Sequence, residues 1–131
     1  MQSTRIFVVD RNPIHNSLIK YHLNINKFSQ VYNFPKGEEC LYRLEKNTIP
    51  DFIITDYDIG NYTGLDFLRK IRDEYPNIRV IYFSSVADPI LAMKLLEAGA
   101  FDFIVKTSKL ETGISELLKN LRYILKEANQ F

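Results

Sequence analysis

Charged and hydroxyl side chains follow the short apolar runs of this sequence at the positions where strands would end. Asp10 follows the first run, and Asp56 and Asp58 come just after a run near the middle of the chain. Ser84 and Lys106 directly follow two later runs. If the runs are parallel strands of one sheet, their carboxyl ends meet at one edge, where open α/β sheets bind ligands. The five side chains are therefore candidates for a single polar site.

The three carboxylates of this group need compensating positive charge. Two carboxylates about 4 Å apart repel each other by about 4 kcal/mol at an effective dielectric constant near 20. Lys106 is one candidate cation, and a divalent metal ion is another. Oxygen ligands without a neighbouring His or Cys suit a hard ion such as Mg²⁺ rather than Zn²⁺.

The elements that position these residues alternate between strands and helices. Apolar runs without polar alternation are typical of strands buried on both faces of a parallel sheet. Segments with helical apolar spacing lie between them. The alternation predicts right-handed crossovers and an α/β fold, a doubly wound parallel sheet with helices on both faces. The expected strands are Ile6–Val9, Gln30–Phe34, Phe52–Ile54, Val80–Phe83 and Phe103–Val105, and the expected helices are one from Asn12, then Gly37–Lys46, Leu65–Asp73, Pro89–Ala98 and a closing helix through Leu110 and Leu125.

The first helix has a clear start signal, because Asn12 is a good cap and the next residue is proline. The nearby His15 is interpreted as a surface residue, and Cys40 as a small packed hydrophobic residue. Apolar spacing predicts that four residues of the first helix share one face, namely Ile14, Leu18, His22 and Ile25.

Length and composition are typical of one soluble globular domain spanning residues 1–131, with 46% hydrophobic and 25% charged residues. No run is long enough to span a membrane, and the single cysteine cannot form a disulfide framework, so we expect a cytoplasmic protein. Seventeen basic and sixteen acidic side chains leave a net charge of +1. That balance argues against direct nucleic-acid binding.

The chain resembles the bacterial response-regulator receiver domain in five segments that agree with that family in order and spacing. The segments are VVDRNP, FPKGEECLYRL, DFIITDYDIGNYTGLDFLRKIR, VIYFSS and AGAFDFIVK. The resemblance covers nearly the whole chain. It implies a single receiver domain with a flavodoxin-like, five-stranded sheet in the order 2-1-3-4-5.

The resemblance implies a regulatory phosphoryl switch of two-component signalling rather than an enzyme. Asp56 would accept the phosphoryl group of a phosphohistidine on a sensor histidine kinase or phosphotransfer domain, forming an aspartyl phosphate. Lys106 and Mg²⁺ would neutralise the phosphoryl oxygens, and Ser84 would hydrogen-bond to them. Asp10 and Asp56 match metal-site positions.

The resemblance also implies a signalling face. Phe103 matches the aromatic position whose rotamer reports the state of the Ser84 hydroxyl. A population shift between two packings would change the surface around residues 89–125, where a downstream effector or output domain would bind. Dimerisation through this face is left open at the level of the family.

Arg11 and Asp58 depart from the family pattern at the metal site. Arg11 stands where the family has a second acidic residue that binds the metal directly, so a ligand has become a cation and the need for Mg²⁺ is weaker. Asp58 stands where the family offers a backbone carbonyl group. It either replaces the missing ligand or pairs with Arg11.

Three further departures lie in the loops. Thr107 replaces a proline that follows a cis bond in the family, and a cis bond before Thr costs about 2.5–4 kcal/mol. We expect either a trans bond with a rearranged loop or a strained cis bond. Gly60 replaces a proline and loosens the loop after Asp56. Ser85 replaces a residue that is often Ala, which is a mild change.

Three other functions compete with that of a phosphoacceptor. A pseudo-receiver would keep the fold as a protein-interaction module that works without phosphorylation, and Arg11 and Thr107 favour it. A flavin-binding redox protein needs a Gly- or hydroxyl-rich phosphate loop where DRNPIHN stands. A hydrolase using Asp10 and Asp56 needs a cap segment or a second acid that the sequence does not offer. The pseudo-receiver is therefore the main alternative.

Overall fold

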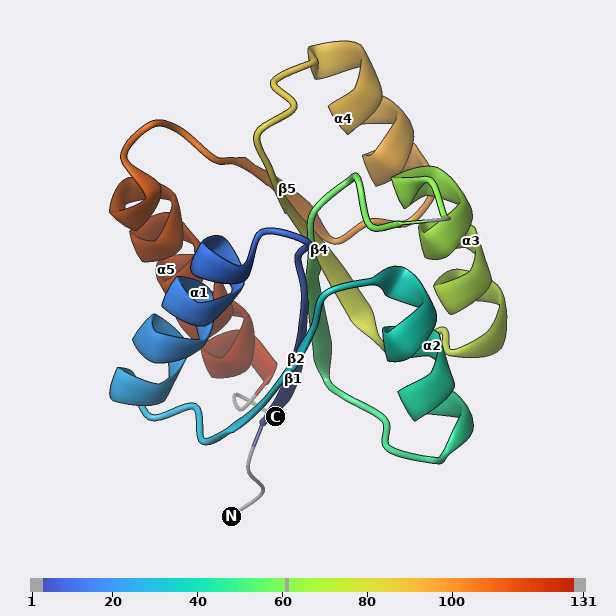
Figure 1. The fold of residues 1–131 in the computed structure, drawn as a ribbon, viewed down its shortest axis with the longest axis horizontal. Helices are drawn as coiled ribbons and strands as arrows, with labels where there is room; N and C mark the ends of the chain where they lie inside the picture. The colour runs from blue at the N-terminus through green and yellow to red at the C-terminus, as the bar shows by residue number, and fades with distance from the viewer. Residues whose placement is uncertain (1–3, 61, 129–131) are drawn as a thin grey trace.

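A parallel five-stranded sheet is the centre of the computed structural model, which describes residues 4–60 and 62–128 (Figure 1). The strand order is β2-β1-β3-β4-β5, so the predicted fold class and the order 2-1-3-4-5 are confirmed. The strands are β1 (Arg5–Val9), β2 (Gln30–Phe34), β3 (Phe52–Thr55), β4 (Arg79–Ser84) and β5 (Asp102–Val105). The helices are α1 (Pro13–Ile25), α2 (Gly37–Glu45), α3 (Gly64–Glu74), α4 (Pro89–Glu97) and α5 (Leu110–Ala128).

The inner strands are the ones that the unbroken apolar runs predict best. In β1, Ile6 pairs with Val31 of β2 on one side and with Phe52 of β3 on the other. The residues of β3 are buried throughout. An apolar side chain is favoured at every position of such a strand because helices cover both faces of the sheet.

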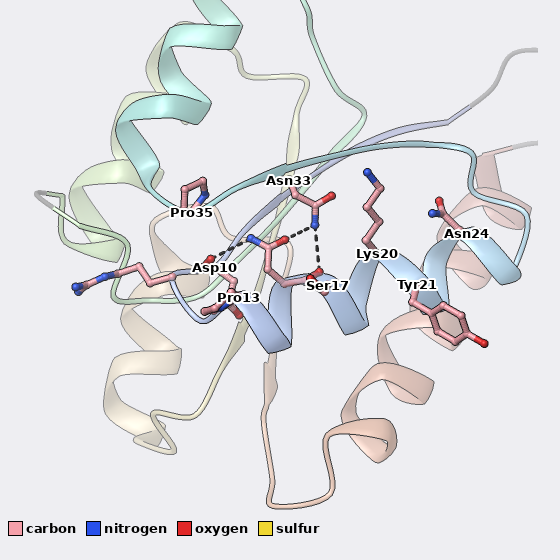
Figure 2. A pocket seen from close by; sticks show the side chains of 10 residues that line it. Asp10, Pro13, Ser17, Lys20, Tyr21, Asn24, Asn33 and Pro35 are labelled. Atoms are coloured by element: carbon pink, nitrogen blue, oxygen red, sulfur yellow. Dashed lines mark hydrogen bonds between the residues drawn. The ribbon is translucent and has the colours of Figure 1, made fainter.

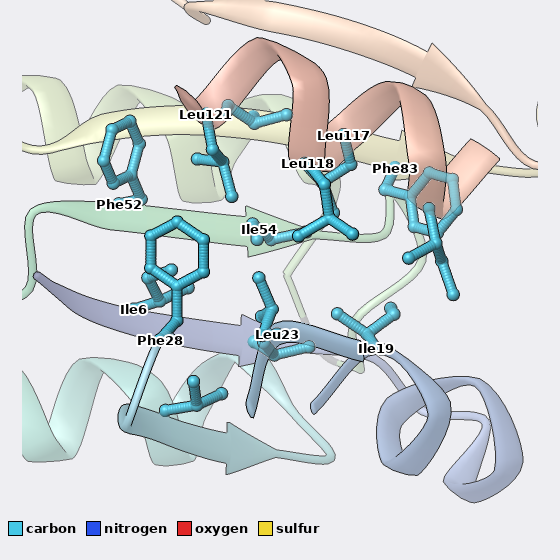
Figure 3. Packing of buried hydrophobic residues seen from close by; sticks show 14 of the residues in the cluster. Ile6, Ile19, Leu23, Phe28, Phe52, Ile54, Phe83, Leu117, Leu118 and Leu121 are labelled. Atoms are coloured by element: carbon cyan, nitrogen blue, oxygen red, sulfur yellow. The ribbon is translucent and has the colours of Figure 1, made fainter. Parts of the chain in front are cut away.

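Helices α1 and α5 cover one face of the sheet, and α2, α3 and α4 cover the other (Figure 1). On the first face, Leu23 of α1 and Leu117 of α5 join Ile6 and Ile54 in one buried cluster (Figure 3). Each fully buried side chain of this size contributes about 1.5–3 kcal/mol. The cluster on the other face includes Phe7, Ile53, Tyr82, Leu44, Phe67, Ile71 and Leu95.

The face predicted for α1 is wrong at two of its four residues, since Leu18 and His22 are half-buried but Ile14 and Ile25 are not. Its buried residues are Asn16, Ile19 and Leu23, whereas Ile14 and Ile25 are 67% and 59% exposed. Asn16 takes a buried place because its amide donates hydrogen bonds to two backbone carbonyl groups where β1 and β2 end. Periodicity counts only apolar residues, so it cannot find a buried face that includes a polar anchor.

Two loops at the carboxyl edge contain Gly60 and Thr107, the residues that stand in place of expected prolines. Gly60, in the loop after β3, has a φ of 103°, which a proline ring fixed near −65° cannot adopt. The bond between Lys106 and Thr107 is trans, since no peptide bond among the described residues is cis. The Thr107 hydroxyl donates to the carbonyl oxygen of Lys109 at 3.0 Å. Of the two conformations expected before Thr107, the structure has the trans bond.

None of the helices in the described ranges has the length and apolar composition that a membrane span needs.

Candidate functional site

Asp10, Asp56 and Lys106 each lie one residue beyond a strand, and their backbone N–H groups continue the sheet's hydrogen-bond ladders. These N–H groups donate to the carbonyl oxygens of the last residues of β2, β1 and β4, at 3.0, 3.0 and 2.7 Å respectively. The backbone of each residue is thereby fixed. Their side chains meet at one edge of the sheet, as their positions after the apolar runs predict.

Lys106 holds the two buried carboxylates together. Its Nζ lies 2.5 Å from Asp10 Oδ2 and 2.9 Å from Asp56 Oδ2. The other oxygens are also engaged, since Asp10 Oδ1 accepts from the N–H of Asn12 at 2.9 Å and Asp56 Oδ1 accepts from the N–H of Tyr57 at 2.7 Å. Every oxygen of both carboxylates therefore has a hydrogen-bond partner.

The burial of this cluster differs from residue to residue. The side chains of Asp10 and Lys106 are each 3% exposed, while that of Asp56 is 18% exposed. The Lys106 ammonium also lies 5.6 Å from the ring centroid of Phe83, a cation–π contact. Removing one partner from such a buried cluster leaves an uncompensated charge. Asp56 is the member of the cluster that solvent and a ligand can reach.

His15 is a site residue that sequence reasoning missed. Its Nδ1 lies 3.3 Å from Lys106 Nζ, and the residue is half-buried rather than on the open surface. His15 belongs to the first turn of α1, which starts at the carboxyl edge of the sheet. That position is the signal that could have found it, because a helix beginning at this edge places its first turn beside the strand ends.

Arg11 and Asp58 form an ion pair at the rim of the site. Arg11 Nη1 lies 3.0 Å from Asp58 Oδ1, and the two side chains are 55% and 74% exposed. Of the two arrangements considered for Asp58, the structure contains the pair with Arg11. An exposed ion pair of this kind contributes little to stability because water competes for both charges.

The buried cluster and the rim pair open onto one cavity of about 580 Å³. A tetrahedral phosphoryl group is small beside that space. The side chains around it carry three carboxylates, one guanidinium, one ammonium and an imidazole. The lining residues are Asp10, Arg11, Asn12, His15, Asp56, Asp58, Ser85, Val86 and Lys106.

Ser84 and Phe103 lie behind the cavity rather than in its wall. Ser84 is fully buried at the end of β4, and its Oγ accepts from the N–H of Val86 at 3.3 Å. Phe103 is half-buried and stacks on Tyr82, with the ring centroids 6.2 Å apart. The Tyr82 hydroxyl in turn donates to the carbonyl oxygen of Gly64, and burial raises the pKa of this phenol. Phe103 is thus partly buried and packed against the core in this structure.

Cys40 is a second buried ionisable residue that takes no part in the cavity. It lies on the buried face of α2, and burial raises the pKa of its thiol. The neutral thiol is therefore the form present at physiological pH, and it packs as the small hydrophobic residue that the sequence predicts.

The residues at this edge bring two carboxylates together, Asp10 and Asp56, rather than three. Within residues 4–60 and 62–128, no group of three or more His, Cys, Asp or Glu side chains is placed to hold one. Asp10 and Asp56 converge, but Asp58 is turned to the guanidinium of Arg11. Mg²⁺ needs near-octahedral oxygen ligation, and the cation of Arg11 opposes a second positive charge beside it.

A second cavity of about 560 Å³ lies between α1 and the end of β2. Figure 2 shows Asn33 turned toward α1, where its amide hydrogen-bonds to the carbonyl oxygen and the side chain of Asn16. Asp10 and Arg11 line both cavities, but Asp56 and Lys106 line only the first of the two. Three carboxylates line the first cavity and one lines the second, so the carboxylates are concentrated in the first.

The sequence matches the family model for the response regulator receiver domain over residues 6–120. A two-component response regulator of Oryza sativa subsp. indica, ORR3, is 30% identical over 103 residues, which are 77% of this chain and 78% of that protein. Phosphorylation and Mg²⁺ binding are general features of receiver domains, which are regulatory and interact with histidine kinases or phosphotransfer proteins and with output domains.

A protein-glutamate methylesterase/protein-glutamine glutaminase of Treponema denticola is 30% identical over 128 residues, which are 92% of this chain. The chain spans about a third of that protein's length (34%), so the methylesterase activity is stated of the relative alone. The receiver domain of the Francisella response regulator 1452 has the same fold, with a TM-score of 0.82 at 22% identity. That match covers 96% of this chain and 99% of the other.

Proposed function

Because the chain belongs to the response regulator receiver domain family, we propose that it accepts a phosphoryl group on Asp56 and signals through a change in its surface. Residues 1–131 would act as one receiver domain in the cytoplasm. The phosphoryl donor would be a phosphohistidine of a sensor kinase or phosphotransfer domain. The response would be passed to an output domain or effector.

The partial exposure of Asp56 is the observation that carries this proposal. Three carboxylates line the cavity, but Asp10 is sealed from solvent and Asp58 is paired with Arg11 in open water. Asp56 alone among these three combines access to the cavity with a buried ammonium at 2.9 Å. A carboxylate nucleophile needs both features, because the donor must reach it and the transferred charge must be neutralised.

The proposed transfer uses this geometry as follows. A carboxylate oxygen of Asp56 forms a bond to phosphorus while the bond from phosphorus to the donor imidazole nitrogen breaks. The imidazole leaves with the electron pair and is protonated from solvent. Lys106 stabilises the charge on the phosphoryl oxygens, so the step depends mainly on positioning and electrostatics.

Ser84 and Phe103 would transmit the change. The Ser84 oxygen accepts a hydrogen bond from Val86, which leaves its hydroxyl proton available to donate. Donation to a phosphoryl oxygen would draw the end of β4 toward the cavity and alter the packing around Phe103. The affected surface, residues 89–125, exposes large apolar side chains on α4, namely Ile90, Met93 and Leu96. We propose this surface as the binding face for the output partner.

Phosphorylation by a small donor tests the proposal directly. The protein is incubated with phosphoramidate in parallel buffers, one with Mg²⁺ and one with EDTA, and its intact mass is followed. We expect a gain of one phosphoryl group that Asp56→Asn abolishes. Asp73→Asn, which changes an exposed carboxylate of α3, is the matched control and should keep the gain. An adduct that persists in Asp56→Asn would contradict the assignment of the acceptor.

A pseudo-receiver is the second candidate, and the Arg11–Asp58 ion pair is the observation that favours it. A domain that has lost a metal ligand can keep its fold and bind a partner constitutively. In that case neither buffer would give an adduct with phosphoramidate. The backbone NMR spectrum would also stay unchanged on addition of beryllofluoride.

A further inference from the structure

Lys106 has no free hydrogen-bond donor for an incoming anion. An ammonium group has three N–H donors, and three acceptors surround this one: Asp10 Oδ2 at 2.5 Å, Asp56 Oδ2 at 2.9 Å and His15 Nδ1 at 3.3 Å. A phosphoryl oxygen can bind Lys106 only by displacing one of them. The contact with His15 is the weakest of the three, since it is the longest and His15 is not a carboxylate.

Arg11 has the donors that Lys106 lacks. A guanidinium has five N–H donors in one plane, and in the described part of the chain a single one of these, on Nη1, meets an acceptor, the Asp58 carboxylate. Asp58 is well exposed, so water can hydrate its carboxylate when the guanidinium leaves. A phosphoryl group can accept two parallel N–H bonds from a guanidinium, whereas the Asp58 carboxylate accepts one through a single oxygen. The phosphoryl group is therefore the better partner for Arg11.

The balance of charges around the cavity also indicates Arg11 as the group that binds the phosphoryl oxygens. Phosphorylation replaces the single negative charge of Asp56 with a doubly charged phosphoryl group. Lys106 is already shared between Asp10 and Asp56, so a further positive charge is required. Arg11 lines the same cavity, and among the described residues no three carboxylates there converge as ligands for a metal ion.

We propose that Arg11 takes the place of the divalent cation at this site, so that Asp56 accepts a phosphoryl group without a metal ion. The proposal rests on the function proposed above and specifies how it is carried out. At rest, Asp58 holds the guanidinium at the rim. On transfer, Arg11 leaves Asp58 and binds the phosphoryl oxygens opposite Lys106.

The covalent step balances without a metal. With phosphoramidate as donor, an Asp56 oxygen forms the bond to phosphorus and the bond from phosphorus to nitrogen breaks. The nitrogen leaves with the electron pair and, once protonated from solvent, departs as ammonia. Arg11 takes no part in the bond changes and acts through its charge and hydrogen bonds.

Metal binding is the first test, and it does not depend on phosphorylation. Mg²⁺ is titrated into the ¹⁵N-labelled protein and the amide resonances of residues near the cavity are followed by NMR. We expect no saturable shift at millimolar Mg²⁺ in the wild type. Arg11→Asp should gain one, because it restores an acidic ligand beside Asp10 and Asp56. Saturable binding to the wild-type cavity would overturn the proposal.

The rate of phosphorylation in EDTA is the second test. We expect the wild type to form the phosphoramidate adduct at the same rate with EDTA as with Mg²⁺. Arg11→Gln, which keeps the polar side chain and loses the charge, should slow the EDTA reaction about tenfold or more. Arg69→Gln, an exposed arginine on α3, is the matched control and should not change the rate. Circular dichroism confirms that each variant is folded.

The outcomes separate this proposal from the function on which it rests. An adduct that forms with Mg²⁺ and disappears in EDTA would overturn the role of Arg11 and leave Asp56 as the acceptor. An unchanged EDTA rate in Arg11→Gln would do the same. No adduct in either buffer would overturn the phosphoacceptor function, and the metal-free reaction with it.

Discussion

Two groups of opposite charges lie side by side at the carboxyl edge of the sheet, and they differ in burial far more than in distance. Lys106 contacts Asp10 and Asp56 inside the molecule, whereas Arg11 contacts Asp58 at the rim. The nitrogen–oxygen distances are all between 2.5 and 3.0 Å. The rim pair is more than half exposed, and the Lys106–Asp10 pair is sealed from water.

The difference in burial indicates which of the two groups of charges can rearrange. Breaking the buried cluster leaves charges without water or a partner, so its geometry is fixed by the fold. Breaking the rim pair only exchanges one partner for water. The buried cluster therefore suits the fixed half of a phosphoryl site, and the rim pair suits the half that rearranges when the anion arrives.

Removing the central cation should have the largest effect on stability. Lys106→Met leaves two carboxylates facing each other without their shared cation, and we expect a loss of about 3–5 kcal/mol in the free energy of unfolding. Urea unfolding followed by circular dichroism measures it. Lys109→Met, at an exposed lysine in the following loop, is the matched control. A loss below about 1 kcal/mol would show that the buried cluster is as exchangeable as the rim.

Removing the buried amide beneath the cluster should have the next largest effect. Asn16→Ala leaves two backbone carbonyl groups at the ends of β1 and β2 without their donor, and we expect a loss of about 2 kcal/mol. Ser17→Ala, at the exposed neighbouring position, controls for the change to alanine in a helix. Equal stabilities of the two variants in the same urea titration would contradict the structural role of Asn16.

The cap of α1 lies between the two regions and should have an intermediate effect. The Asn12 side chain accepts from the N–H groups of Ile14 and His15 at 2.9 and 3.2 Å. We expect Asn12→Ala to cost about 1 kcal/mol, and Asn12→Ser to recover most of it because serine is also a good cap. Thermal unfolding of the three proteins checks this order, and a serine variant no better than alanine would count against it.

Breaking the rim pair should have the smallest effect on stability. We expect Arg11→Gln to change the free energy of unfolding by less than about 0.5 kcal/mol. Salt should reduce even that difference, because exposed charges are screened. Urea unfolding at low and high ionic strength measures both effects. A loss as large as that of Lys106→Met would remove the distinction between a fixed and an exchangeable group of charges.

Most of the fold follows from local patterns. β1, β3 and β4 are continuous apolar runs because both of their faces are covered, and α1 begins where Asn12 and the following proline place its start. The buried face of α1 could not be predicted in the same way. It depends on Asn16 reaching two carbonyl groups that are brought together by the sheet.

The sequence predicts which residues of the site gather at the carboxyl edge, because this depends only on their positions in the chain. Asp10, Asp56 and Lys106 meet because each directly follows a strand. Their partners depend on side-chain conformation, so the sequence left two arrangements for Asp58 open and the contact between His15 and Lys106 unseen. Charge type and position in the chain indicate which groups gather, but not which of them touch.

The placement of β1 between β2 and β3 also has a consequence for the synthesis of the chain. β1, α1 and β2 leave the ribosome before β3, yet Ile6 pairs with Phe52 of β3. During that interval one side of β1 has unpaired backbone groups and uncovered apolar side chains, a surface on which strands of other chains can add. The yield of the protein in a cell would therefore depend on how this nascent edge is protected until residues 52–55 have emerged.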